Sequence, residues 1–234
     1  MAVESIFYSV SGLSCRGALI WDDGVKAPRP LLLMAPNWRG VIKPSIETGQ
    51  MLAHEGYVVF VADMFGEGNG PVGTEDPMTF LRPFLADVAG MRKRISAALD
   101  TLTREADRRA IGDISRRAAI GFCFGGGIVN QLAVRMGPDL AAAVPFYGSQ
   151  PSAADAAKIK APLLAHYGEL DTRITDGWPA FDAALTQAEV PHEGHIYKGA
   201  NHGFHNDTTP RYDEAAAKEA WQRTLDWFNK YLRA

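Results

Sequence analysis

The sequence has little of what marks secreted, membrane-spanning or nucleic-acid-binding chains. Its 234 residues include two cysteines, too few for the disulfide framework of a small secreted protein. It contains no run of about 18 apolar residues, so no membrane-spanning helix is predicted. Lysine and arginine number 24 and aspartate and glutamate 27, a net charge of −3, and this balance argues against a strongly basic nucleic-acid binder.

Export signals are also lacking. Residues 1–8 carry no basic segment followed by an apolar one, so no secretory signal is expected. With two cysteines and no such signal, the simplest expectation is a protein of the reducing cytoplasm. No segment has the amphipathic pattern of a dedicated interface, and we expect a monomer or a weak homo-oligomer.

What the sequence does contain is an alternation of short apolar runs and helical periodicities. Such an alternation predicts an α/β fold, a single domain over residues 1–234 with a mostly parallel sheet of about eight strands and helices on both faces. Residues 65–77, rich in glycine, proline and acidic side chains, predict a surface loop. Strands are predicted at 6–10, 15–21, 31–35, 57–62, 117–122, 141–147, 162–167 and 192–197, and helices at 43–55, 80–106, 125–136, 178–188 and 212–231.

The most informative segment surrounds Cys123. Residues 121–126 read GFCFGG, the nucleophile elbow of α/β-hydrolases with cysteine in place of serine. The flanking glycines fit a chain that folds back sharply, and the helix N-terminus beside the cysteine favours its thiolate. An inert buried cysteine in a glycine-rich turn is the alternative. Cys15 lies in an alternating strand without such a turn, and we expect it to be structural.

Two downstream residues can complete a triad in the chain order of α/β-hydrolases, which is nucleophile, acid and histidine. Asp171 comes shortly after the strand predicted at 162–167, and His202 lies in a loop of small residues after the last strand. Since the carboxyl ends of parallel strands share one edge, Cys123, Asp171 and His202 are expected to meet there. Glu169 is the alternative acid.

Further residues are candidates to complete the site. The backbone N–H groups of Phe124 and Trp38, the latter in the loop after the strand at 31–35, are predicted to form an oxyanion hole. Tyr147 could line an apolar pocket, with plain core packing as its alternative. His205 could also line the site, and Asn37 is a further candidate substrate contact. No metal site is predicted, because His192 and His195 lack a neighbouring set of cysteine or carboxylate ligands.

With these residues, the sequence resembles the dienelactone hydrolase family of α/β-hydrolases over nearly its whole length. The likeness is carried by residues 121–126, Asp171 and residues 200–204, which read ANHGF. The resemblance implies an α/β-hydrolase fold, a Cys–Asp–His triad and no cofactor. It also implies a small-molecule substrate, an enol-lactone such as a carboxymethylene-butenolide, which is hydrolysed to an open-chain keto acid.

Two positions depart from the family pattern. Where well-known members carry a glutamate that helps to generate the thiolate, this chain has Asn37, whose amide cannot accept the thiol proton. Activation would then fall to His202 or to another carboxylate such as Glu67. Well-known members also bind the substrate carboxylate with two arginines. Arg82 matches the first of them. Where the second is expected, after His202, this chain has His205 and its neighbours in place of an arginine.

These departures keep other functions open. The first alternative is a broader carboxylesterase or thioesterase with the same triad. Alternatives from other classes are a non-catalytic protein that binds a small acid on a hydrolase fold, and a redox sensor at Cys123. The redox alternative lacks a resolving cysteine nearby in the sequence.

Overall fold

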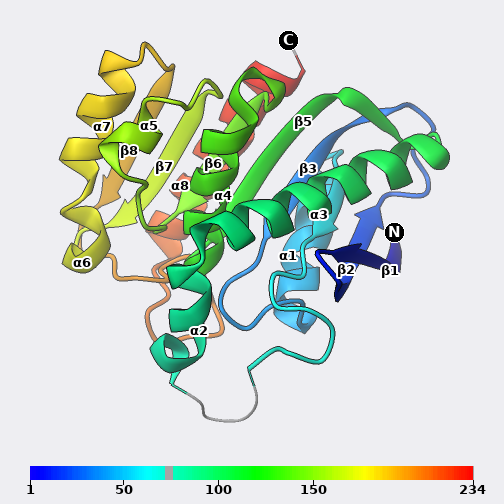
Figure 1. The fold of residues 1–234 in the computed structure, drawn as a ribbon. Helices are drawn as coiled ribbons and strands as arrows, with labels where there is room; N and C mark the ends of the chain where they lie inside the picture. The colour runs from blue at the N-terminus through cyan, green and yellow to red at the C-terminus, as the bar shows by residue number, and fades with distance from the viewer. Residues whose placement is uncertain (72–75, 234) are drawn as a thin grey trace. The chain divides into compact units, whose positions relative to one another are not determined.

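The computed structural model describes residues 1–71 and 76–233, and the chain forms two compact units. The first unit is Met1–Arg117 and the second is Ala118–Ala234. Figure 1 shows strands and covering helices in both units. This confirms the predicted α/β class, with eight strands in the described residues and mostly parallel pairing. The single domain over residues 1–234 stays a prediction.

The first unit is built on a hairpin and two buried strands. Its strands are β1 (Ala2–Val10), β2 (Leu13–Trp21), β3 (Arg29–Ala35) and β4 (Val58–Val61), in the order β1-β2-β4-β3. The strands predicted at 6–10 and 15–21 form an antiparallel hairpin. Its turn residues Ser11 and Gly12 both have positive φ, 50° and 82°, as a two-residue hairpin turn requires. β3 and β4 pair in parallel and are buried throughout, as their apolar sequences predict.

The helices of the first unit correct one prediction. α1 (Lys43–His54) agrees with the predicted bounds to within a residue, but residues 80–106 do not form one helix. The chain breaks at Asp87 into α2 (Pro77–Ala86) and α3 (Val88–Arg108), because Asp87 has the non-helical angles φ −107° and ψ 68° and its carboxylate caps the N–H of Gly90 at 2.8 Å. Of the surface loop predicted at 65–77, positions 72–75 lie outside the described residues.

The second unit holds parallel strands in the order β5-β6-β7-β8. β5 (Gly112–Phe122) begins in the first unit, and β6 (Ala142–Phe146), β7 (Leu163–Gly168) and β8 (His192–Tyr197) follow. Phe122 pairs with Phe146, and Phe146 with His166, so these strands end at one edge. Figure 1 shows α4 in front of β6 and α8 behind it.

The helices of the second unit differ in how well the sequence predicts them. The long ones are α4 (Phe124–Met136), α7 (Trp178–Gln187) and α8 (Glu214–Leu232), and each lies within two residues of its predicted bounds. The short α5 (Ala153–Ala156), α6 (Thr172–Thr175) and η1 (Gly137–Asp139) were not predicted, because one turn is too short to show a helical period.

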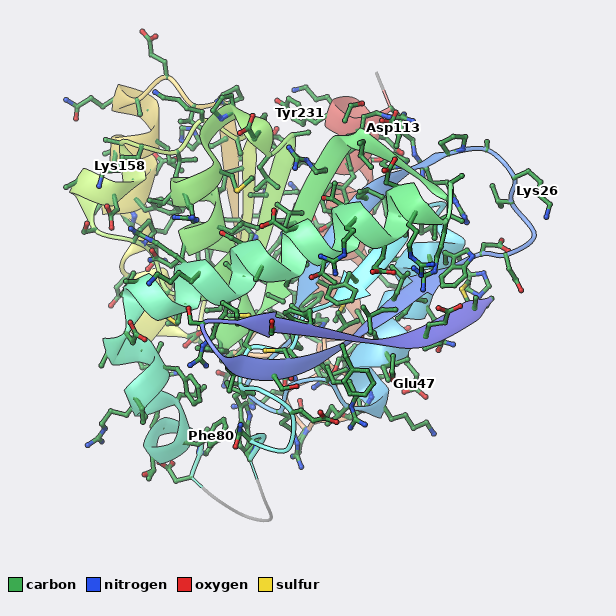
Figure 2. The ribbon with its side chains drawn as sticks, turned by 45° about the vertical axis from the view of Figure 1, so that its right-hand side comes forward. Lys26, Glu47, Phe80, Asp113, Lys158 and Tyr231 are labelled. Carbon is green, nitrogen blue, oxygen red and sulfur yellow. The ribbon has the colours of Figure 1, made fainter. Side chains whose placement is uncertain are left out.

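The surface carries solvated charged side chains, as Lys26 and Lys158 illustrate in Figure 2. No helix within residues 1–71 and 76–233 is long and apolar enough to cross a membrane.

Candidate active site

The candidate site lies at the carboxyl edge of the strands of the second unit. Cys123 directly follows β5 and Tyr147 directly follows β6, while Asp171 and His202 lie in the loops after β7 and β8. Because the strands run parallel and end together, these side chains meet although 79 positions separate Cys123 from His202.

Cys123 occupies a sharp turn between β5 and α4. Its φ is 58° and its ψ −118°, a strained conformation for a residue with a side chain. Its N–H donates to the carbonyl of Phe146 at 3.0 Å, and its own carbonyl accepts the N–H of Gly126 at 3.0 Å. The residue is partly exposed. Phe124 begins α4, so the positive end of the helix dipole lies beside the sulfur.

Gly121 makes this turn possible. A Cβ at that position would lie 2.1 Å from the carbonyl oxygen of Gly125, and backbone atoms cannot move aside as a flexible side chain can. We expect Gly121→Ala to lower the free energy of unfolding by about 1–3 kcal/mol or more, the range for overpacked sites, as measured by urea denaturation. Gly70→Ala is the control, because a Cβ there has no atom within 4 Å. Equal stability of the two variants would contradict this account of the turn.

His202 connects Cys123 to Asp171. Its Nε2 lies 3.0 Å from the Cys123 Sγ, and its Nδ1 lies 2.5 Å from Oδ2 of Asp171. The Asp171 side chain is 5% exposed and that of His202 15%, so the interaction between them is largely shielded from water, which strengthens it. The structure thus brings the three predicted triad residues into hydrogen-bond distance.

Glu169, the alternative acid, lies elsewhere in the same loop. Its carboxylate accepts the N–H of Gly199 at 2.8 Å, while Asp171 reaches His202. The two loops are also joined by backbone, since the N–H of Leu170 donates to the carbonyl of Ala200 at 2.9 Å. Glu169 therefore supports the loop that carries His202, and Asp171 contacts the imidazole.

Opposing effects set the pKa of His202. Burial lowers the pKa because it disfavours the charged imidazolium, whereas hydrogen bonds to Asp171 and Cys123, and the negative charge of these groups, raise it. The stabilising partners prevail, and the pKa of His202 is raised to about 9. At neutral pH the ring is therefore an imidazolium, which can stabilise a thiolate at Cys123.

Tyr147 and His205 form a buried pair next to this arrangement. The Tyr147 hydroxyl is hydrogen-bonded to Nδ1 of His205, and Tyr147 is 2% exposed. The Tyr147 ring lies 4.7 Å from that of His202. In the structure, each of these two side chains has the other as its hydrogen-bond partner. Their role as substrate contacts stays a prediction.

Two glycines to which the sequence assigned no role, Gly148 and Gly168, permit the close approach of these segments. A Cβ on Gly148 would lie 2.2 Å from the carbonyl carbon of Gly126, and one on Gly168 would lie 2.7 Å from the carbonyl oxygen of Ala200. The available signal was a glycine at or just beyond the end of an apolar strand, where another backbone can come close.

Comparison with known proteins identifies the family. The sequence model described as "Dienelactone hydrolase family" matches residues 16–232. An Escherichia coli O157:H7 protein named "Putative carboxymethylenebutenolidase" is 32% identical over 215 residues, covering 87% of this chain and 78% of the relative. The chain belongs to the dienelactone hydrolase family.

Solved structures of dienelactone hydrolase-like proteins agree with this assignment. A dienelactone hydrolase-like promiscuous phosphotriesterase from metagenomic libraries has a TM-score of 0.88 at 28% identity, with 98% of each chain covered. A protein from Klebsiella pneumoniae, described as a putative dienelactone hydrolase, has a TM-score of 0.86 at 27% identity, with 99% of this chain and 100% of that chain covered. As a member of this family, the protein is a hydrolase with a small-molecule substrate.

The other site residues predicted for this chain belong to the first unit. Asn37 and Trp38 lie in the loop after β3, where the Asn37 side chain accepts the N–H of Arg39 at 2.9 Å. Arg82 is exposed on α2, and Glu67 lies 3.7 Å from Arg16 in a surface ion pair. Their predicted roles, as an oxyanion donor (Trp38), substrate contacts (Asn37 and Arg82) and an alternative activating carboxylate (Glu67), stay predictions.

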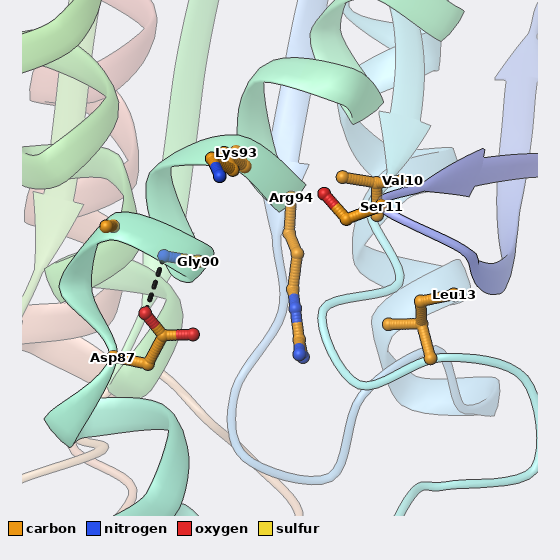
Figure 3. A pocket seen from close by; sticks show the side chains of 8 residues that line it. Val10, Ser11, Leu13, Asp87, Gly90, Lys93 and Arg94 are labelled. Atoms are coloured by element: carbon orange, nitrogen blue, oxygen red, sulfur yellow. Dashed lines mark hydrogen bonds between the residues drawn. The ribbon is translucent and has the colours of Figure 1, made fainter.

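A cavity of about 240 Å³ lies in the first unit, between the end of the β1–β2 hairpin and the start of α3 (Figure 3). Two of its charged residues already have partners, since Asp87 caps Gly90 and Nη1 of Arg94 donates to the carbonyl of Met64 at 2.8 Å. The lining residues include no cysteine or histidine. The cavity therefore offers none of the chemistry expected of this family's catalytic site.

Metal-ligating side chains do not gather in the part of the chain that the structure describes. No group of three or more histidine, cysteine, aspartate or glutamate side chains there could hold an ion.

Proposed function

We propose that this hydrolase cleaves an enol-lactone or another activated carboxylic ester through a covalent thioester on Cys123. His202 acts as the proton-transfer group, and Asp171 orients and stabilises it. The observation that carries the proposal is the bridging position of His202, with Nε2 3.0 Å from Sγ and Nδ1 2.5 Å from the Asp171 carboxylate.

The first step needs a thiolate, and His202 is placed to stabilise it. The raised pKa of His202, about 9, keeps the imidazole protonated at neutral pH. This imidazolium, 3.0 Å from Sγ, and the N-terminus of α4 both favour negative charge on the sulfur. In this proposal the thiolate needs no glutamate at the position of Asn37.

The thiolate then attacks the carbonyl carbon of the ester. The S–C bond forms as the carbonyl electron pair moves to oxygen, and the N–H of Phe124 is the proposed donor to that oxyanion. The intermediate collapses by breaking the ester C–O bond, and the leaving oxygen takes the proton from His202. Water next attacks the thioester and gives a proton to Nε2, and cleavage of the S–C bond restores the thiolate.

The leaving group decides which esters suit this chemistry. A thiolate is itself a good leaving group, so the first tetrahedral intermediate goes forward best when the ester oxygen departs readily. An enolate departs more readily than a simple alkoxide, which depends more strongly on the proton from His202. This argument, together with the carboxymethylenebutenolidase-type relative, favours an enol-lactone.

A neutral activated ester is the second candidate substrate, and His205 favours it. Burial lowers the pKa of His205 to about 3, so this side chain is uncharged at neutral pH. It therefore offers no positive charge to the carboxylate of a lactone acid.

The test compares a carboxymethylene-butenolide with 4-nitrophenyl acetate at equal enzyme concentration. A higher kcat/KM for the lactone supports the enol-lactone proposal, whereas turnover of the aryl ester alone supports the second candidate. A burst of 4-nitrophenolate equal to the enzyme concentration is expected if deacylation is slow. Hydrolysis of neither substrate would contradict both candidates.

A further inference from the structure

The mechanism leaves unexplained why a strained tyrosine lies buried beside His202. Tyr147 has a φ of 35°, a region that residues with side chains rarely occupy. Its N–H is fixed by the carbonyl of His166 at 2.7 Å. Strain of this kind persists where the surrounding structure enforces it, and it is common next to functional groups.

His205 joins this tyrosine to two other segments. Its ring stacks on Phe122, with centroids 4.3 Å apart and planes at 10°, and Phe122 immediately precedes Cys123. Its Nδ1 is hydrogen-bonded to the Tyr147 hydroxyl, and it follows His202 by three residues in one loop. His205 thus links the nucleophile turn, the end of β6 and the loop that carries the imidazole.

The pair is uncharged, which matters next to an imidazolium. Burial raises the pKa of Tyr147 well above its usual value and lowers that of His205, so the hydroxyl donates and Nδ1 accepts. A cation at either position would repel protonated His202. The neutral Tyr147 ring instead packs on the His202 ring, with centroids 4.7 Å apart and planes at 59°.

We infer that Tyr147 and His205 are positioning residues that hold the His202 imidazole in line between Cys123 and Asp171. The inference rests on the proposed function in one respect, namely that proton transfer through His202 drives catalysis. The pair acts through the orientation of His202, since the Tyr147 hydroxyl is hydrogen-bonded to His205 and the Tyr147 ring packs on the His202 ring.

The experiment uses Tyr147→Phe, His205→Phe, the double variant and His205→Asn. Tyr147→Phe removes only the hydroxyl, and the amide of His205→Asn keeps an acceptor close to the place of Nδ1. The measurements are kcat and KM for 4-nitrophenyl acetate and the pH dependence of Cys123 alkylation by iodoacetamide. Alkylation reports the thiolate directly and needs no substrate.

We expect each phenylalanine variant to lower kcat about 10- to 100-fold with little change in KM, the effect of a misplaced catalytic group. Alkylation at neutral pH should slow and its midpoint should move to higher pH, because a misaligned imidazolium stabilises the thiolate less. The double variant should resemble either single one, since both break the same link. His205→Asn should recover part of the lost rate.

Tyr197→Phe is the matched control. Its hydroxyl is also buried and bonded to a histidine, Nδ1 of His166, at 2.9 Å, but the structure gives it no contact with His202. It should lower stability as Tyr147→Phe does and leave the alkylation profile unchanged.

Several outcomes would overturn the inference. If the Tyr147 and His205 variants lose stability like Tyr197→Phe but keep kcat and the alkylation profile, the pair is merely structural. If KM rises while alkylation is unchanged, the pair contacts substrate. Should the His205 variants fail to fold, Tyr147→Phe alone decides. An enzyme that hydrolyses no ester refutes the proposed function, whereas the alkylation profiles still test the positioning of His202.

Discussion

Replacing Cys123 with alanine is expected to lower kcat/KM by about 10⁴- to 10⁶-fold, the loss typical of removing a triad nucleophile. No other nucleophile lies within hydrogen-bond distance of His202 Nε2 among the contacts that the structure describes. The fold should be retained, because the turn depends on Gly121 and on backbone hydrogen bonds and not on the thiol. The measurements are steady-state hydrolysis of both test esters and circular dichroism.

Cys15→Ala is the control for this variant. Cys15 is buried, and burial raises its pKa to about 11, so its thiol is unreactive at neutral pH. We expect the control to keep full activity and to be alkylated once per chain, at Cys123. Retention of activity in Cys123→Ala would remove the covalent mechanism.

Cys123→Ala, together with peroxide treatment of the wild type, distinguishes a hydrolase from a binding protein and from a redox sensor. A binding protein would turn over neither ester, and its Cys123→Ala variant would still bind a lactone acid. A redox sensor would show reversible oxidation of Cys123 by peroxide that changes its state without any hydrolysis. The hydrolase is supported if the wild type and Cys15→Ala hydrolyse the esters and Cys123→Ala does not.

The nucleophile turn was predictable because its determinants are local. An apolar strand, a glycine two residues before Cys123 and glycines after it specify a sharp strand-to-helix junction whatever the rest of the chain does. The order of the strands then placed Asp171 and His202 at the same edge. The short one-turn helix α6 just after Asp171 was missed, but it does not alter this placement.

The pairing of Tyr147 with His205 was not predictable in the same way. The two residues are 58 positions apart, and each looks like an ordinary core or pocket residue in its own segment. Their contact depends on the registers between β6 and β7 and between β7 and β8, and on the path of the loop after β8. The break at Asp87 was missed for a related reason, because apolar spacing continues through 80–106 while one carboxylate redirects the backbone.

Replacing Asp171 with asparagine is expected to lower kcat by about 10³- to 10⁴-fold with a small change in KM. Asparagine keeps the size of the side chain but loses the charge that stabilises the imidazolium. Its amide can also present an N–H to Nδ1, which would hold the imidazole in the wrong tautomer. The measurement is kcat and KM for 4-nitrophenyl acetate.

Glu169→Gln is the matched control, since it makes the same chemical change two residues away. Its side chain contacts the N–H of Gly199, and a glutamine oxygen can still accept that bond. We expect activity close to wild type. If Glu169→Gln were the impaired variant and Asp171→Asn the active one, the acid would be Glu169, and the assignment of Asp171 would be wrong.

The pH dependence of His202 gives a second, independent readout of Asp171. In the wild type the imidazole should titrate with a midpoint of about 9, followed by the NMR shift of its ring protons. In Asp171→Asn the hydrogen bond and the negative charge are lost while burial remains, so the midpoint must move to lower pH. The imidazolium would then lose its proton nearer to neutral pH. Without that positive charge, the thiolate would lose the group that stabilises it. An unchanged midpoint would mean that Asp171 does not set the charge of His202, whatever its effect on kcat.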